Sequence, residues 1–229
     1  MDNRHIEQLE KILNYTFSDK SLLELALTHR SFQVNNNERL EFLGDSILNF
    51  IISDLLFKEF NSLPEGDLSR LRSQLVKSTT LSEIGILLNL GDYLILGEGE
   101  LKSSGWRRPS ILADSVEAII GAVFIDGGIN ASGDLITSWF KDKIDAIDPN
   151  NIQKDSKSIL QEWLQAKKIA LPDYNVVSIE GEAHCQHFKV SCLIPKLGLG
   201  IEGEGSSRKI AEQSAAEAVL KNLKNNSEL

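Results

Sequence analysis

Apolar residues in the first two thirds of the chain recur every three or four positions, the spacing of one helix face. An apolar run over 22–27 follows Ser18 and Asp19, which are suited to capping the start of a helix. Longer helical stretches are predicted over 38–60, 67–89 and 111–124. The residues Asp-Gly-Gly at 126–128 end the last stretch, and a further helix is predicted beyond them. Because strand-like alternation is scarce before residue 170, the pattern predicts an all-α domain over residues 1–147.

A different pattern begins after a polar stretch at 148–154, which contains Pro149 and two Asn residues and is typical of a linker. One helix is predicted over 158–168, and three segments then alternate apolar and polar positions with the period of a strand. These segments and a final helix lie at 174–179, 188–194, 197–201 and 209–223. The order α-β-β-β-α predicts a small second domain over residues 155–225, so the expected fold class is multi-domain.

The composition is that of an ordinary globular protein. Hydrophobic residues make up 41% and charged residues 25% of the 229 positions, which excludes wholesale disorder. No apolar run approaches the ~20 residues that span a bilayer, and the polar N-terminus has no signal-peptide core. Cys185 and Cys192 are too few for a disulfide framework, and we expect both to be free thiols. Together these features predict a cytoplasmic protein with no membrane partner.

The net charge of −9 is unevenly distributed along the chain. Residues 1–153 carry 14 Lys and Arg against 23 Asp and Glu, a balance of −9, whereas residues 154–224 carry 10 against 9, a balance of +1. An acidic chain normally argues against a polyanionic partner. A carboxylate cluster that holds a divalent metal gives the same count, however, until the charge of the metal is added.

Two helical stretches carry acids on one face. Glu38, Glu41 and Asp45 are spaced i, i+3, i+7, and Asp114 and Glu117 are spaced i, i+3. In an average amphipathic helix such acids form the solvated face, and this interpretation stays open. It fits poorly around Asp114, where nearly every neighbour is apolar and an unpaired carboxylate would cost several kcal/mol.

Hard divalent cations with oxygen ligands would neutralise such a set of acids. No His or Cys joins the set, so Mg²⁺ is the expected occupant. A site of this kind activates water and stabilises charge on a phosphoryl group during transfer.

The segments that carry these acids resemble the signature of bacterial ribonuclease III. The resemblance rests on LTHRSF at 27–32, NERLEFLGDS at 37–46, LPEG at 63–66 and LADSVEAIIG at 112–121. The C-terminal part resembles the double-stranded-RNA-binding domain that follows the nuclease domain in that family. The two resemblances cover almost the whole chain, and the run from Glu38 to Ser46 is highly specific.

The resemblance implies a role for each matching acid. It assigns metal binding to Glu41, Asp45, Asp114 and Glu117, of which Asp45 and Glu117 match the pair treated as catalytically essential. It assigns substrate positioning and shaping of the RNA-binding cleft to Glu38 and Glu65 and counts both among the catalytic acids, and it makes Glu100 a further acid near the site.

The resemblance also implies a dimer contact and a basic loop. Phe42 matches an aromatic residue that inserts into the partner subunit, although the pattern alone favours core packing for it. Arg107 and Arg108 match a basic loop that contacts RNA. Trp106 and Pro109 depart from the usual residues of that loop, which puts its RNA contact in doubt but not the acids.

Three regions of the second domain are candidate RNA contacts. Gln161 and Gln165 share a helix face and suit hydrogen bonds to 2′-hydroxyls in the RNA minor groove. A lone loop histidine is usually a solvated bystander, but His184 matches the family's second groove contact. The third region combines a helix N-terminus with hydroxyls and cations that suit phosphate, and its candidate residues are Ser207, Arg208 and Lys209.

The resemblance implies an endoribonuclease that cleaves double-stranded RNA with Mg²⁺, for which Mn²⁺ can substitute, and without an organic cofactor. It implies 5′-phosphate and 3′-hydroxyl ends, a homodimer that cuts both strands to leave short 3′ overhangs, and processing of precursors of rRNA, some mRNA and tRNA. The competing classes are a non-catalytic RNA-binding protein and a ribosome assembly factor. Both are disfavoured because every acid position is filled.

Overall fold

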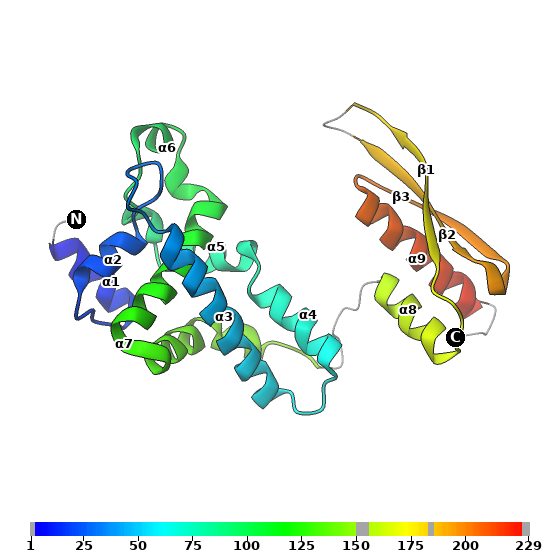
Figure 1. Ribbon diagram of the computed structural model, residues 1–229, viewed down its shortest axis with the longest axis horizontal. Helices are drawn as coiled ribbons and strands as arrows, with labels where there is room; N and C mark the ends of the chain where they lie inside the picture. The colour runs from blue at the N-terminus through cyan, green and yellow to red at the C-terminus, as the bar shows by residue number, and fades with distance from the viewer. Residues whose placement is uncertain (1–2, 150–155, 183–185, 226–229) are drawn as a thin grey trace. The chain divides into compact units, whose positions relative to one another are not determined.

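The computed structural model describes residues 3–149, 156–182 and 186–225. The chain divides into two compact units, Met1–Ile152 and Gln153–Leu229 (Figure 1). The first unit is helical and the second is a helix, three strands and a helix, so the predicted fold class is confirmed. Among the described residues, no helix is long and apolar enough to cross a membrane.

The described residues of the first unit, 3–149, form seven α-helices. They are α1 (Asn3–Leu13), α2 (Lys20–Ala26), α3 (Glu38–Glu59), α4 (Glu65–Leu75), α5 (Ser78–Leu87), α6 (Glu98–Lys102) and α7 (Pro109–Asp145), with short 3-10 turns at Leu90–Asp92 and Gly105–Arg107. The Asp19 side chain accepts a hydrogen bond from the Ser21 amide and caps α2, as expected. Helix α1 was not predicted, because its polar composition hid the buried positions Ile6, Leu9 and Leu13.

The single helix predicted over 67–89 is wrong. Lys77 adopts an extended backbone (φ −67°, ψ 149°) and separates α4 from α5. The hydroxyl of Thr80 donates to the carbonyl oxygen of Gln74 at 2.9 Å, which satisfies one of the carbonyls that the end of α4 leaves without a helical partner.

Helices α3 and α7 form the centre of the first unit and pack with their backbones almost in contact. A Cβ atom on Gly44 would lie 1.8 Å from the carbonyl oxygen of Glu117, and one on Gly121 would lie 2.3 Å from that of Leu40. Leu48, Ile52, Ile119 and Ile120 from these helices are buried in the surrounding core. Two glycines therefore set how closely α3 approaches α7.

Helix α7 breaks at Gly128, whose backbone (φ 77°, ψ −173°) is not helical. The sequence predicted that one helix ends at 126–128 and that another follows, and the break at Gly128 lies at this position. Just before it, the Asp126 carboxylate accepts hydrogen bonds from the Tyr15 hydroxyl and from the amides of Ser18 and Asp19. These bonds tie the α1–α2 connection to the end of the first half of α7.

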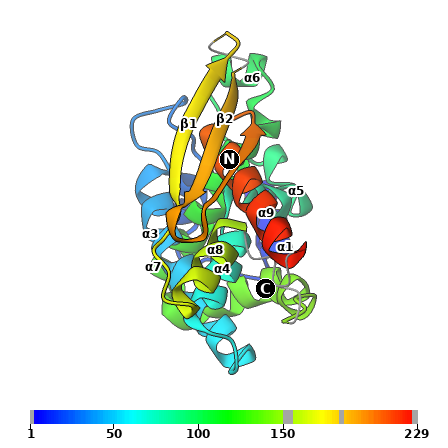
Figure 2. The same cartoon turned by 90° about the vertical axis from the view of Figure 1, so that its right-hand side faces the viewer.

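In the part of the second unit that the structure describes, a three-stranded antiparallel sheet carries two helices on one face (Figure 2). Its elements are α8 (Ser156–Ala166), β1 (Asp173–Glu180), β2 (His187–Ile194), a 3-10 turn at Pro195–Leu197, β3 (Leu199–Gly205) and α9 (Arg208–Asn225). The strands follow the order β1-β2-β3, and Cys192, Leu160 and Val219 lie in the core between sheet and helices. Cys192 is a free thiol, and burial raises its pKa, whereas Cys185 lies outside the described residues.

Candidate active site

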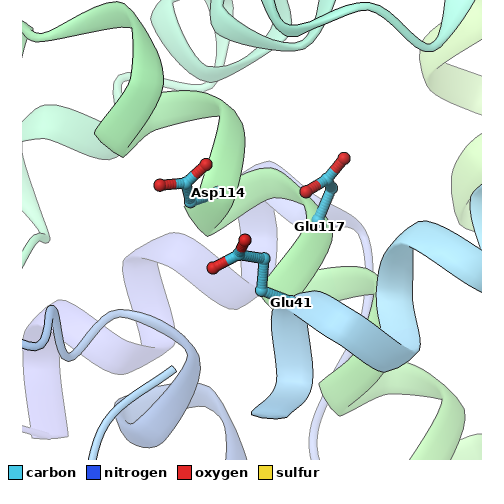
Figure 3. Close-up of side chains that lie close together, drawn as sticks. All are labelled: Glu41, Asp114 and Glu117. Carbon is cyan, nitrogen blue, oxygen red and sulfur yellow. The ribbon is translucent and has the colours of Figure 1, made fainter. Parts of the chain in front are cut away.

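Three acids from α3 and α7 converge on one point. Ligand oxygens of Glu41, Asp114 and Glu117 all lie within 4.8 Å of one another (Figure 3). Glu41 comes from α3, one turn before Gly44, and the other two come from successive turns of α7. The close approach of the two helices at Gly44 thus brings acids that are distant in sequence into one cluster.

The negative charges of the cluster repel one another. Burial, together with the charges of Asp45, Glu41 and Asp114, raises the pKa of Glu117 to about 8. Burial and the charge of Asp114 also raise the pKa of Glu41. Burial raises the pKa of Asp114, although the nearby His29 and Arg30 oppose it. The simple solvated-face interpretation therefore fails for Glu117, and a divalent cation would relieve the repulsion.

Asp45 lies one turn beyond Glu41 on α3 and is exposed. Its carboxylate accepts a hydrogen bond from Asn49 Nδ2 at 2.8 Å. Its charge contributes to the raised pKa of Glu117, so Asp45 belongs to the electrostatic surroundings of the cluster even though it is outside the three converging acids.

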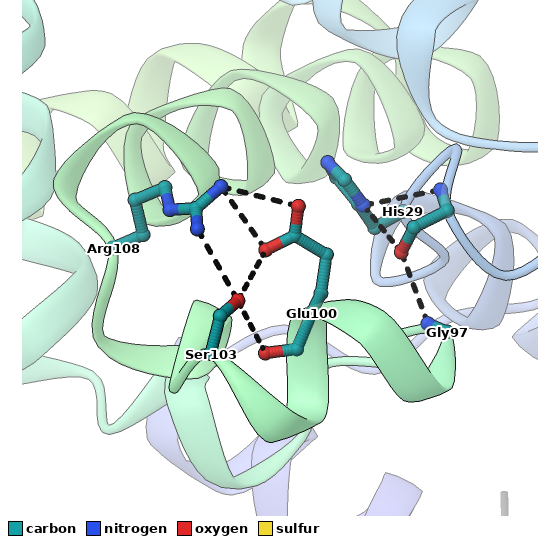
Figure 4. A network of polar contacts seen from close by, with 6 residues as sticks. His29, Gly97, Glu100, Ser103 and Arg108 are labelled. Carbon is teal, nitrogen blue, oxygen red and sulfur yellow. Dashed lines mark hydrogen bonds and ion pairs between the residues drawn. The ribbon is translucent and has the colours of Figure 1, made fainter.

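The cluster opens into a polar cleft of about 440 Å³. Two ion pairs lie in its lining. Arg30 Nη1 lies 3.4 Å from Glu38, and Arg108 Nη1 lies 3.1 Å from Glu100. Arg108 Nη2 also donates to Ser103 at 3.3 Å (Figure 4). Of the acids with predicted roles, Glu38, Glu41, Glu100 and Asp114 line this cleft.

His29 and Arg30, for which the sequence predicted no role, also line the cleft. His29 Nδ1 lies 2.8 Å from Ser31 Oγ, which accepts a hydrogen bond from the Gly97 amide (Figure 4). Burial lowers the pKa of His29. The sequence did hold a signal for these two residues, because they lie in the segment 27–32, which precedes the acidic run in the family signature.

Glu65 does not line the cleft of its own chain. It begins α4, is exposed, and accepts a hydrogen bond from Ser69 Oγ at 2.7 Å. It lines a separate hollow of about 390 Å³ together with Phe50 and Phe57.

The two arginines of the basic loop face different surroundings. Arg108 turns to Glu100 in the cleft, whereas the Arg107 guanidinium lies 4.1 Å from the centre of the Trp106 ring. Trp106 and Arg107 line another hollow, of about 320 Å³. The unusual tryptophan of this loop therefore holds one of its two cations.

Phe42 is 78% exposed, so the core-packing interpretation is wrong for the single chain. Phe50 and Phe57, about two and four turns further along α3, are also exposed. A hollow of about 650 Å³ adjoins Phe42 and is lined in part by Leu22, Leu25 and Ile125. We call this line of exposed phenylalanines (Phe42, Phe50, Phe57) the α3 stripe.

The candidate RNA contacts of the second unit are accessible where they are described. Gln161 and Gln165 are exposed on α8. Ser207 precedes α9, and its hydroxyl accepts a hydrogen bond from the Ile210 amide at 3.3 Å. Arg208 and Lys209 begin α9 and are exposed. His184 lies outside the described residues.

Two family models match the chain, one for each unit. The model described as Ribonuclease-III-like matches residues 19–144, and the model described as double-stranded RNA binding motif matches residues 156–223. A crystal structure of the nuclease domain of ribonuclease III from Campylobacter jejuni is 43% identical, covering 65% of this chain and all of that one, with a TM-score of 0.61.

Full-length relatives are closer in sequence. "Ribonuclease 3" of Hahella chejuensis is 54% identical over 215 residues, which is 94% of this chain and 95% of the relative. "Ribonuclease 3" of Pseudoalteromonas translucida is 54% identical over 222 residues, which is 97% of this chain and 98% of the relative. With a converging acid cluster in the first unit and an RNA-binding fold in the second, the chain belongs to the ribonuclease III family of endoribonucleases.

Proposed function

We propose that this chain is a Mg²⁺-dependent endoribonuclease that hydrolyses the backbone of double-stranded RNA. The observation that carries the proposal is the convergence of Glu41, Asp114 and Glu117 with a Glu117 pKa raised to about 8. Half-buried acids held this close together repel one another, and such an arrangement is costly to fold unless it has a use.

The residues present fit a hard divalent cation. The donor set offers carboxylate oxygens only, which suits Mg²⁺, with Mn²⁺ as a substitute, and no organic cofactor is part of the proposal. Glu41, Asp114 and Glu117 would hold the ion, with Asp45, one turn beyond Glu41 on α3, as a fourth proposed ligand. When bound, Mg²⁺ supplies an activated water and charge stabilisation at phosphate.

The arginine side chains of the cleft would orient the substrate. Arg30 and Arg108 lie beside the acids and can each donate to phosphate oxygens. Glu38 and Glu100, which pair with these arginines, hold them at the cleft wall. In-line attack by water on the phosphodiester would release 5′-phosphate and 3′-hydroxyl ends.

We infer that two copies of the chain act together as a homodimer. The α3 stripe and the adjoining apolar hollow are complementary in character, and a two-fold axis would place each Phe42 at the hollow of the other copy. A structure of the Campylobacter jejuni nuclease domain, 43% identical with a TM-score of 0.59, describes flexibility in a region involved in dimer formation.

Dimerisation would also explain the position of Glu65. This acid lies beside Phe50 and Phe57, so it would face the partner rather than its own cleft. A duplex has two strands, and two symmetric sites would cut both and leave short 3′ overhangs.

The second unit would supply most of the affinity for the duplex, through Gln161 and Gln165, His184, and Ser207 with Arg208 and Lys209. Arg108 would add a contact from the first unit. By its family, the protein would process precursors of rRNA and of some mRNA and tRNA in the cytoplasm.

Incubation of the purified protein with a long RNA duplex, with and without Mg²⁺, tests the proposal. We expect short duplex products only with Mg²⁺, with ends that accept ligation as 5′-phosphates. A single-stranded RNA of the same sequence is the control. Duplex binding without cleavage at any Mg²⁺ or Mn²⁺ concentration would identify a non-catalytic RNA-binding protein instead.

A further inference from the structure

Glu212, in the second turn of α9, is held by cations from two different elements. Lys157 Nζ, at the start of α8, lies 2.7 Å from Glu212 Oε2, and Arg208 Nε donates to Oε1 at 2.8 Å. The Glu212 side chain is only 12% exposed. Burial opposes ionisation, but the hydrogen bonds from Lys157 and Arg208 outweigh it and hold the pKa of Glu212 below its ordinary value.

Lys157 is itself fixed in place. Its ammonium lies 4.5 Å from the centre of the Tyr174 ring on β1, and its backbone amide donates to Gln213 Oε1 at 3.1 Å. Glu212 therefore bonds to a cation that α8, β1 and α9 together immobilise. An anchor of this kind holds the carboxylate in one position.

The bond from Arg208 leaves the outer edge of its guanidinium available. The carboxylate takes the Nε–H, and the side chain of Arg208 is still 61% exposed. Among the described residues, neither Nη atom of Arg208 has a hydrogen-bond partner. These two nitrogens carry the fork of donors that binds phosphate in a bidentate manner. They lie at the N-terminus of α9, where backbone amides also favour an anion.

We propose that Glu212 is a positioning residue for duplex RNA: it fixes the guanidinium of Arg208 so that both Nη atoms face a backbone phosphate. This inference rests on the proposed function, in which the second unit binds the duplex. Without Glu212, Arg208 would have to lose several rotamers on binding, and RNA affinity would fall.

Considered only as a negative charge, Glu212 predicts the opposite change in RNA affinity. A carboxylate near phosphate repels it, so neutralising Glu212 without any positioning role would leave RNA affinity the same or strengthen it. The sign of the change therefore separates positioning from long-range electrostatics.

The test measures duplex affinity of the full chain in EDTA for the native protein, Glu212→Gln, Arg208→Ala and the double variant. We expect Glu212→Gln to weaken binding about threefold to tenfold, the usual effect of leaving one long side chain to be ordered on binding. The double variant should bind no worse than Arg208→Ala alone. With Mg²⁺, Glu212→Gln should raise KM for duplex cleavage and leave kcat unchanged. Glu217→Gln is the matched control, since Glu217 pairs with Lys221 on the same helix at 2.7 Å but is 55% exposed.

Equal or tighter binding by Glu212→Gln would overturn the inference. So would a loss of the same size in the Arg208→Ala background, because Glu212 would then act by supporting the fold. If Glu212→Gln does not fold, the duplex affinity of Arg208→Lys tests the inference instead. This variant keeps the positive charge and the Lys157–Glu212 pair but loses the two Nη donors of the guanidinium. Native affinity in Arg208→Lys would refute positioning, whereas failure of the native chain to bind any duplex would refute the proposed function itself.

Discussion

Gly44 of α3 lies directly against the backbone of Glu117 on α7, so that a Cβ atom on Gly44 would stand 1.8 Å from the carbonyl oxygen of Glu117. The contact joins the two helices at the turns that carry the converging acids. The geometry of the acid cluster thus depends on a backbone contact that tolerates no side chain.

Gly44→Ala should therefore force α3 and α7 apart. We expect the free energy of unfolding to fall by about 3 kcal/mol, the upper end for overpacking a core, because the clashing atom is backbone and cannot rotate away. Urea denaturation measures this. Gly133→Ala is the control, since its Cβ would meet only Ile51 Cδ1 at 3.7 Å. Alanine there should cost nothing or add up to about 1 kcal/mol through helix propensity. Equal stability of Gly44→Ala and the native chain would contradict the predicted clash.

Glu117→Gln should abolish cleavage and leave duplex binding nearly intact. The substitution removes a proposed metal ligand, and we expect a loss of about hundredfold or more in kcat, as when a charge-stabilising group is removed from a transition state. Single-turnover cleavage and gel-shift assays measure the two properties. Glu98→Gln, at an exposed acid outside the cleft, is the control. A parallel loss of binding and cleavage would show that the role of Glu117 is wrongly assigned.

The raised pKa of Glu117 predicts how the stability of the metal-free chain depends on pH. The folded chain binds this proton more tightly than the unfolded chain, so the contribution of Glu117 to stability is fully present below the ordinary glutamate pKa and is lost as the pH rises through about 8. In EDTA, Glu117→Gln should match the native chain near pH 4 and exceed it in thermal stability near pH 9. A difference in Tm that does not change with pH would count against the raised pKa. Mg²⁺ should restore the stability of the native chain at high pH more than that of the variant.

Phe42→Ala should weaken the proposed dimer without unfolding the chain. Because Phe42 is 78% exposed in the single chain, its truncation removes partner contacts rather than core contacts. We expect the free energy of dimerisation to weaken by about 2 kcal/mol or more, as for a buried aromatic residue at an interface. Analytical ultracentrifugation over a dilution series measures this, with Val34→Ala, at a residue 99% exposed, as the control. An unchanged dimer would remove the α3 stripe from the interface.

A chain that ends at Asn150 should cut duplex RNA only at low salt. It keeps the acid cluster but loses the RNA-binding fold, and its acidic balance leaves few cations to attract phosphate. Raising the ionic strength should suppress its activity more than that of the full chain. Equal activity of the two at moderate salt would show that the second unit does not supply the binding energy assigned to it.

The sequence predicted the acid cluster because helical spacing places Asp114 and Glu117 on one face of α7 and Glu41 on an acidic face of α3. It could not place Glu65, since the position of Glu65 depends on how the start of α4 packs beside Phe50 and Phe57 of α3. Nor could the sequence predict that Arg107 and Arg108, which are adjacent in the chain, face different surroundings. Such facts follow from tertiary packing, which a periodic pattern does not encode.

The fold of the second unit was more predictable from sequence. Short connections join its antiparallel strands, and apolar and polar residues alternate along each of them. Its strands lie within a few residues of the expected segments, and only the 3-10 turn at Pro195–Leu197 delays the start of β3. The bond between Glu212 and Lys157 was not predictable, since it joins α9 to a helix more than fifty residues earlier.

The glycine contacts between α3 and α7 also bear on which ion the site can select. Mg²⁺ requires oxygen ligands at about 2.0–2.1 Å, whereas Ca²⁺ accepts about 2.3–2.6 Å and a looser shell. Because the missing side chains of Gly44 and Gly121 let the two helices approach until their backbones touch, the acids on opposite helices are held at short range. For the Mg²⁺ site proposed above, the spacing of the two helix axes would thus favour a small ion, and we expect a methyl group added at Gly44 to shift the preference towards a larger one.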